Sequence, residues 1–84
     1  MIILYTTSCE TCNKAHNVKL IERECLNRGI QFQQRITLFF EMWQKEAERL
    51  EQTFHAKQPF VYNTETKKVL QINLEDVDIL QIFE

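Results

Sequence analysis

The chain has 84 residues, which is enough for one domain and too few for two. Its apolar fraction of 44% is ordinary for a folded protein and argues against disorder. Ten Lys and Arg residues and twelve Asp and Glu residues give a formal net charge of −2, and neither sign is concentrated in blocks. The composition therefore indicates neither a nucleic-acid-binding surface nor a polybasic membrane-binding patch.

The sequence runs from Met1 directly into an apolar stretch, without the basic region or the small-residue cleavage site of a secretory signal. No apolar run approaches the length of a membrane span. We therefore expect a cytoplasmic protein, in which structural disulfides are rare and closely spaced cysteines are more often catalytic or metal-binding. The chain has three cysteines, and this odd number also argues against a fully paired disulfide scaffold.

The first half of the chain alternates between strand-like and helix-like patterns. Residues 2–6 are apolar and β-branched at their start, which predicts a short buried strand. A helix is then predicted to run to Arg28, because apolar side chains recur at steps of three and four residues. Gly29, the single glycine of the chain, tolerates a left-handed backbone and should end that helix. The alternation of apolar and polar residues in 30–36 predicts a second strand.

A second amphipathic helix is predicted after this strand, with Thr37 as its capping residue. Apolar residues that repeat at helical steps should form the face of this helix that contacts the sheet; they are Phe39, Trp43, Ala47, Leu50 and Phe54. The helical pattern fades before Pro59, and a residue that precedes a proline is pushed toward extended geometry.

The last part of the chain predicts a hairpin and a third helix. Residues 60–62 and 67–72 have strand character, and the polar residues 63–66 between them are typical of a turn. Asn73 can cap a final helix whose buried side would include Leu74. The order of strand, helix, strand, helix, strand, strand and helix predicts an α/β fold, in which three helices cover a mixed four-stranded sheet whose first two strands are parallel.

Two cysteines, Cys9 and Cys12, follow the first predicted strand and lie at the start of the first predicted helix. Their spacing lets them close a small disulfide ring with little backbone movement. The free N–H groups and the dipole at a helix start stabilise a thiolate, which is the form that attacks a disulfide. This context favours a redox dithiol, with Cys9 as the nucleophile at the exposed edge of the turn and Cys12 as the resolving thiol one helical turn further on.

Two other readings of the cysteine pair stay open on the sequence alone. A zinc or iron–sulfur site would need further ligands; His16 lies on the same helix face as Cys12, but no second CxxC pair completes a zinc site, and we expect no bound metal. A non-catalytic interaction module that keeps the fold is the other alternative. Cys25 falls on the apolar face of the helix, where a buried inert cysteine is the simplest interpretation.

Taken together, these features resemble the glutaredoxins of the thioredoxin fold over nearly the whole length of the chain. The resemblance rests on the first strand, the cysteine pair, Pro59 at the opening of the third strand, and the final hairpin and helix. It implies a thioredoxin fold and a single glutaredoxin-like domain over residues 1–84. The chain departs from the family between its cysteines, where Glu10 and Thr11 replace Pro-Tyr, and it lacks the Gly-Gly pair after the fourth strand.

The resemblance implies a thiol–disulfide oxidoreductase that reduces protein disulfides or glutathione mixed disulfides and contributes to cell redox homeostasis. It implies that the bond before Pro59 is cis and aligns the substrate, and it assigns substrate contacts to Thr11, Gln58 and Asp76. No bound cofactor is expected, and glutathione or a thioredoxin-reductase-type flavoenzyme would supply the electrons. A ribonucleotide reductase is a familiar partner of small family members, and we expect a monomer without nucleic-acid or membrane partners.

Overall fold

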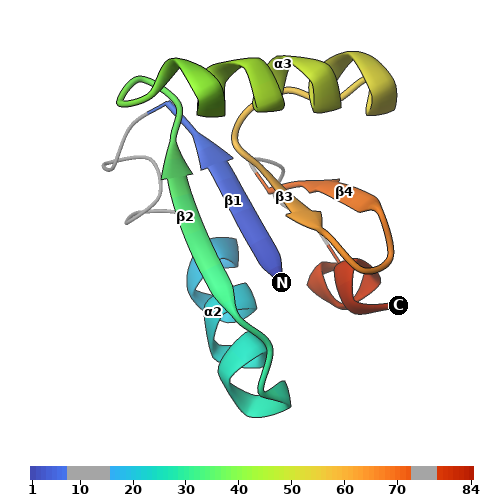
Figure 1. The fold of residues 1–84 in the computed structure, drawn as a ribbon. Helices are drawn as coiled ribbons and strands as arrows, with labels where there is room; N and C mark the ends of the chain where they lie inside the picture. Colours follow the sequence, from blue (N-terminus) through green and yellow to red (C-terminus); the bar gives the residue numbers. More distant parts are fainter. Residues whose placement is uncertain (8–15, 73–77) are drawn as a thin grey trace.

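The computed structural model describes residues 1–7, 16–72 and 78–84 (Figure 1). In chain order its elements are strand β1 (Ile2–Thr6), helix α2 (His16–Arg28), strand β2 (Phe32–Ile36), helix α3 (Glu41–Phe54), strand β3 (Phe60–Asn63), strand β4 (Lys68–Gln71) and the 3-10 helix η1 (Ile79–Phe83). The protein therefore has a mixed α/β fold, in agreement with the predicted fold class.

The four strands form one sheet in the order β2-β1-β3-β4. Strand β1 is parallel to β2, with Ile2 opposite Phe32, and antiparallel to β3, with Tyr5 opposite Phe60. Strands β3 and β4 form the predicted antiparallel hairpin, whose turn ends at Lys67 with a positive φ of 61°. All five residues of β1 are buried, because this strand has a neighbour on each side and helices on both faces (Figure 1).

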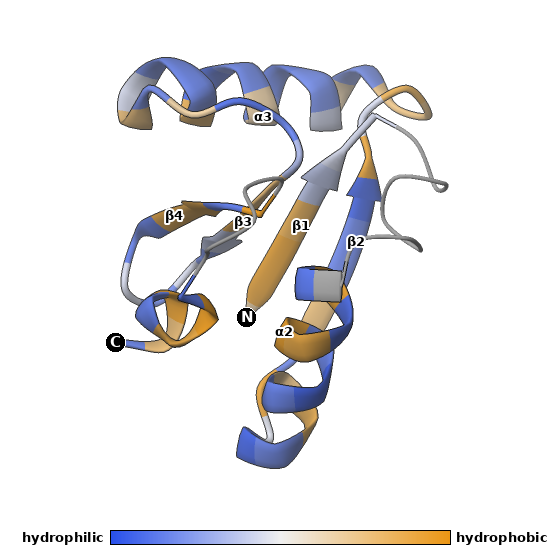
Figure 2. Ribbon diagram, turned by 180° about the vertical axis from the view of Figure 1, so that it is seen from behind, coloured by the Kyte–Doolittle hydropathy of each residue, from blue (hydrophilic) through white to orange (hydrophobic). Residues whose placement is uncertain are grey.

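Alternate residues of β1 belong to two separate cores, one on each face of the sheet. Ile2 and Leu4 pack with buried residues of α2 and with Ile82 of η1. Ile3 and Tyr5 pack on the other face with Phe60 and with Ala47 of α3. Figure 2 shows the strongly apolar β1 beside the more polar β2, with α3 on the opposite side of the sheet from α2. Each face of the sheet is therefore covered by helical elements, one by α2 and η1 and the other by α3.

The end of α2 follows the prediction made from its glycine. Gly29 has a φ of 68°, a left-handed conformation that a residue without Cβ adopts at no steric cost. The backbone N–H of Ile30 donates to the carbonyl of Cys25 at 2.8 Å and so satisfies one of the last carbonyls of the helix. This turn directs the chain back toward β2.

Two predictions about the start of α3, the role of Thr37 and the place of Phe39, were wrong. Thr37 does not cap α3; the N-cap position is occupied by Phe40, which makes no capping side-chain bond. The hydroxyl of Thr37 is used in contacts with β1 and with Gln58, which a local helix signal does not include. Phe39 consequently lies before the helix and is exposed, whereas Ala47 of the same predicted stripe is buried.

The prediction of a third α-helix is not met by the residues that the structure describes. The final segment forms η1, a short 3-10 helix in which the carboxylate of Asp78 accepts a hydrogen bond from the N–H of Leu80 at 3.2 Å. Such tight helices occur mainly as short pieces. The proposed cap Asn73 and the following residue Leu74 lie outside the described residues. Neither α2 nor α3 is long and apolar enough to cross a lipid bilayer.

Candidate active site

The predicted site residues divide into two groups. Cys9, Thr11, Cys12 and Asp76 fall within residues 8–15 and 73–77, which lie outside the described part of the chain. Gln58 and Pro59 are described. Other described residues border these two segments.

Pro59 lies at the entry to β3, beside the end of β1. The peptide bond between Gln58 and Pro59 is cis. Because Tyr5 pairs with Phe60 in the antiparallel register, Pro59 lies at the end of the sheet where β1 finishes, at Thr6. Residue 8 follows this end of β1 by two positions. The role of Pro59 in substrate alignment stays a prediction.

Two hydrogen bonds connect Pro59 to residues that border both undescribed segments. The carbonyl of Pro59 accepts a bond from the N–H of Ile72 at 3.3 Å. The carbonyl of Ile72 accepts a bond from the side-chain amide of Asn17 at 3.0 Å. Asn17 is in the first turn of α2 and Ile72 immediately precedes residue 73. The start of α2 is therefore bonded to Ile72, and Ile72 is bonded to Pro59.

The side chain of Gln58 is held by two neighbours within the protein. Its amide oxygen accepts a hydrogen bond from the hydroxyl of Thr37 at 3.1 Å, and its amide nitrogen donates to Glu51 of α3 at 3.1 Å. The N–H of Thr37 in turn donates to the carbonyl of Thr6 at 2.9 Å. These contacts occupy both ends of the Gln58 amide, so a substrate contact from this residue would come from its backbone.

A cluster of polar side chains connects α3 to β1 and β2 near the same end of the sheet. The Tyr5 hydroxyl donates to the carboxylate of Glu46 at 3.0 Å, and Arg35 of β2 forms an ion pair with that carboxylate. Burial, reinforced by the hydrogen bond and the negative charge of Glu46, raises the pKa of Tyr5 to about 12. Tyr5 is therefore protonated at neutral pH and serves as a structural donor.

Asn17, Thr37 and Ile72 are the residues of this region that the sequence analysis did not assign to it. An Asn in the first turn of a helix and a Thr after a strand are common as local capping residues, so their types give no signal of a distant partner. Asn17 and Ile72 are 55 positions apart in the chain. Only the fold brings them together.

The contact between Asn17 and Ile72 allows a direct test. Asn17→Leu removes the donor and leaves the Ile72 carbonyl, on a buried residue, without that bond. We expect the free energy of unfolding to fall by about 1–3 kcal/mol, the usual effect of an unsatisfied buried acceptor. Urea denaturation measures it. Asn27→Leu, at an exposed position on the same helix, is the matched control; an equal loss in both variants would contradict the assigned role of Asn17.

Cys25 lies on α2 and is buried in the core, as predicted. Burial raises the pKa of its thiol to about 11 from an ordinary value of 9.0. The thiol is therefore protonated at neutral pH. A neutral buried thiol is a poor nucleophile, so Cys25 is unsuited to disulfide exchange.

We expect the raised pKa of Cys25 to make the fold less stable at alkaline pH. Above pH 9 the unfolded chain releases the thiol proton while the folded protein keeps it until about pH 11, so the free energy of unfolding falls as the pH rises through this range. The contribution is up to about 2 kcal/mol. Denaturation at pH 8 and pH 11 measures it, with Cys25→Val as the comparison. An identical loss in the variant would show that other groups cause the alkaline destabilisation.

No metal-binding group is present in the described part of the chain: it contains no cluster of three or more His, Cys, Asp or Glu side chains that could hold a metal ion. Cys9 and Cys12 lie outside that part of the chain. His55, the other histidine, is exposed and occupies the C-cap of α3 with a left-handed φ of 54°. A backbone hydrogen bond from its N–H to Glu51 closes the helix, so its role there is structural.

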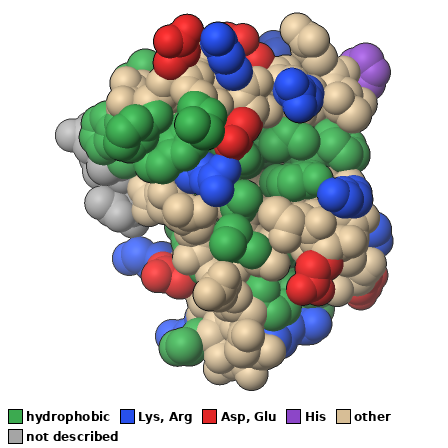
Figure 3. Space-filling model, viewed as in Figure 1, with side chains coloured by type: hydrophobic (Ala, Val, Ile, Leu, Met, Phe, Trp, Pro, Cys, Tyr) green, Lys and Arg blue, Asp and Glu red, His purple; other side chains and the backbone are tan. Residues whose placement is uncertain are grey.

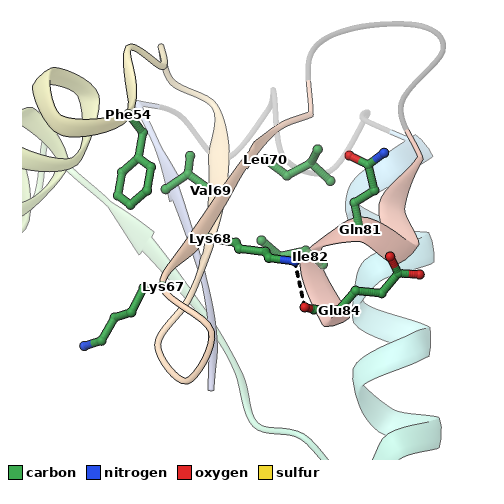
Figure 4. Close-up of a pocket in the computed structure, with 8 residues that line it drawn as sticks. All are labelled: Phe54, Lys67, Lys68, Val69, Leu70, Gln81, Ile82 and Glu84. Carbon is green, nitrogen blue, oxygen red and sulfur yellow. Dashed lines mark hydrogen bonds between the residues drawn. The ribbon is translucent and has the colours of Figure 1, made fainter.

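A cavity of about 430 Å³ lies between the hairpin and η1 (Figure 4). Phe54, Val69 and Ile82 provide apolar walls, and Lys68 donates a hydrogen bond to the backbone oxygen of Glu84 at 2.7 Å. A second cavity of similar volume lies between α2 and β2, beside Cys25. Neither is lined by Gln58 or Pro59, so we do not assign the predicted chemistry to them.

Comparison of the chain with models of known protein families, with curated proteins and with solved structures finds no match.

Proposed function

We propose that the protein is a glutaredoxin-like thiol–disulfide oxidoreductase that uses Cys9 and Cys12 as its redox pair. The observation that carries this proposal is that hydrogen bonds link three separate segments of the chain, from Asn17 through Ile72 to Pro59. Hydrogen bonds through Ile72 and Asn17 join the opening of β3, the chain before residue 73 and the first turn of α2. Two of these three segments border the parts of the sequence that contain the cysteine pair and Asp76.

The arrangement of the sheet gives further support to a thioredoxin fold. Its order is β2-β1-β3-β4, with β1 and β2 parallel and β3 antiparallel to β1. Helix α2 follows β1 and packs on one face, while α3 follows β2 and packs on the other. In the proposed fold, Pro59 would align an extended substrate segment next to Cys9, through the backbone of Gln58.

In the proposed reaction, the Cys9 thiolate attacks one sulfur of the substrate disulfide. A bond forms between Cys9 and that sulfur, and the other substrate sulfur leaves as a thiolate that takes up a proton. The Cys12 thiolate then attacks Cys9, which releases the second substrate thiol and leaves a disulfide between Cys9 and Cys12. The substrate gains two electrons and two protons, and the protein dithiol loses them.

Two electrons from a donor must then reduce the protein disulfide. Glutathione or a thioredoxin-reductase-type flavoenzyme is the proposed donor, and no tightly bound cofactor is needed for either exchange step. Protein disulfides or glutathione mixed disulfides are the proposed substrates, and a ribonucleotide reductase is a candidate protein partner. We propose a monomer that works in the cytoplasm.

A coupled reduction assay tests the function. The reduced protein is incubated with a protein disulfide such as insulin, and NADPH consumption is followed with glutathione and glutathione reductase or with thioredoxin reductase. Turnover that requires the protein and one of these donors supports the proposal and identifies the donor. Absence of turnover with both donors, for a protein shown to contain free Cys9 and Cys12 thiols, would reject it.

A further inference from the structure

Four large apolar side chains are exposed together at the turn between β2 and α3. The exposed fractions are 73% for Leu38, 66% for Phe39, 57% for Phe40 and 69% for Met42, and we call this group the 38–42 surface. Figure 3 shows a continuous group of apolar side chains over this turn. Clustered exposure of this kind often marks an interaction site, whereas single exposed apolar residues are common.

The backbone and one aromatic contact hold the 38–42 surface in place. The N–H of Phe39 donates to the carbonyl of Ile36 at 3.0 Å, and the carbonyl of Phe40 accepts from Gln44 at 3.2 Å in the first turn of α3. The rings of Phe40 and Trp43 meet edge to face, with centroids 4.4 Å apart. A surface that is ordered before binding loses less conformational entropy when a partner binds.

The 38–42 surface is adjacent in sequence to Thr37, which contacts the proposed active site. It begins one residue after Thr37, which is buried and bonded to Thr6 at the end of β1. The side-chain hydroxyl of Thr37 donates a hydrogen bond to Gln58, which precedes Pro59. The 38–42 surface therefore begins at the residue next to Thr37, which is itself bonded to Gln58.

The position and the charge of the surface favour one of its possible occupants. Its exposed apolar area is on the order of 500 Å², taking roughly 200 Å² for each large side chain. A stable dimer usually buries about 800 Å² on each partner, of which little more than half is apolar, so area alone does not separate a second copy from a substrate. The bond between Thr37 and Gln58, next to Pro59, favours a substrate of the proposed site. The neighbouring charges are paired, Lys45 with Glu41 and Arg35 with Glu46, so they offer little to a charged ligand.

We propose that the 38–42 surface binds an apolar segment adjacent to the disulfide of a protein substrate. This inference rests on the proposed function and adds a substrate preference to it. Binding on this surface would hold a polypeptide substrate near the reactive pair and leave the exchange chemistry unchanged. A small disulfide, which cannot reach the surface, would gain nothing from it.

Two peptides of equal length, each closed by one disulfide, test the preference. One carries Leu and Phe beside its cysteines and the other carries Ser at those positions. We expect the wild-type protein to reduce the apolar peptide with about tenfold higher kcat/KM, the effect of partly burying one large side chain. In the Phe39→Ser/Met42→Ser variant the ratio should fall to about one, while turnover of bis(2-hydroxyethyl) disulfide stays within about twofold.

Leu26→Ser is the matched control, because Leu26 is 82% exposed but lies near the end of α2. This variant should keep the tenfold preference. Equal preference in the wild type and in the Phe39→Ser/Met42→Ser variant would overturn the inference. So would a wild-type dimer, detected by sedimentation, that the double substitution dissociates, because the surface would then bind a second copy.

Trp43, the single tryptophan, gives a second measurement that does not depend on redox activity. Its ring contacts Phe40, so its fluorescence should change when the apolar peptide, made with Ser in place of both cysteines, is titrated. The Ser-flanked peptide should give no change. If this selective binding occurs but no disulfide is reduced, the proposed function fails and the docking surface stands. If no selective binding occurs, the docking surface is rejected whatever the activity.

Discussion

Cys9→Ser should abolish disulfide exchange, whereas Cys12→Ser should accumulate a mixed disulfide with the substrate. The first variant lacks the attacking thiol, so no covalent intermediate can form. The second keeps this thiol but lacks the one that releases the substrate. Cys25→Ala should retain turnover, because the Cys25 thiol is buried and its pKa is raised to about 11.

Mass spectrometry of the three variants after incubation with a disulfide peptide measures this directly. The adduct should have the mass of the protein plus one peptide and should disappear on addition of dithiothreitol. An adduct on Cys9→Ser with none on Cys12→Ser would reverse the assigned roles. Adducts that require Cys25 would contradict the interpretation of that residue as inert.

Phe60→Ala should give the largest loss of stability. Phe60 is fully buried at the start of β3, and its ring lies 5.3 Å from that of Tyr5, centroid to centroid. Removing the ring leaves a cavity between the sheet and α3, and such substitutions usually cost about 3–5 kcal/mol. For a domain of this size that is a large part of the total free energy of unfolding. Urea denaturation followed by circular dichroism measures the loss.

Phe39→Ala is the matched control for this substitution. The same ring is removed, but from an exposed position outside α3, so the free energy of unfolding should change by less than about 0.5 kcal/mol. A comparable loss in both variants would mean that Phe39 is packed against the protein. That result would also contradict the description of the 38–42 surface.

The sequence predicted the order of strands and helices along the chain as far as β4, because the signals for these elements are local. A fully apolar run marked β1, a single glycine marked the end of α2, and polar residues 63–66 marked the hairpin turn. Each of these depends on the conformational preferences of neighbouring residues or on the burial of a short periodic segment. The edge position of β2 also agrees with its polar residues.

The failures came from contacts between distant segments. Thr37 has the type and position of a helix cap, but its hydroxyl is bonded to Thr6 and Gln58 instead. Phe39 fits a four-residue repeat with Trp43, yet the helix begins only at Glu41. For the candidate site, the cysteine spacing suggested the chemistry, whereas the Asn17 bond to Ile72 could not be predicted because it depends on tertiary structure.

The central position of β1 has a consequence for the order in which the protein can fold. This strand precedes the other described elements in the chain, but one of its two partners is β3, with Ile2 opposite Asn63. During synthesis, its apolar side chains and one row of backbone groups remain uncovered until residue 63 has left the ribosome. Closing such a long-range pair carries an entropic cost that local contacts avoid, so the pairing of β1 with β3 is expected to form late and to set the folding rate.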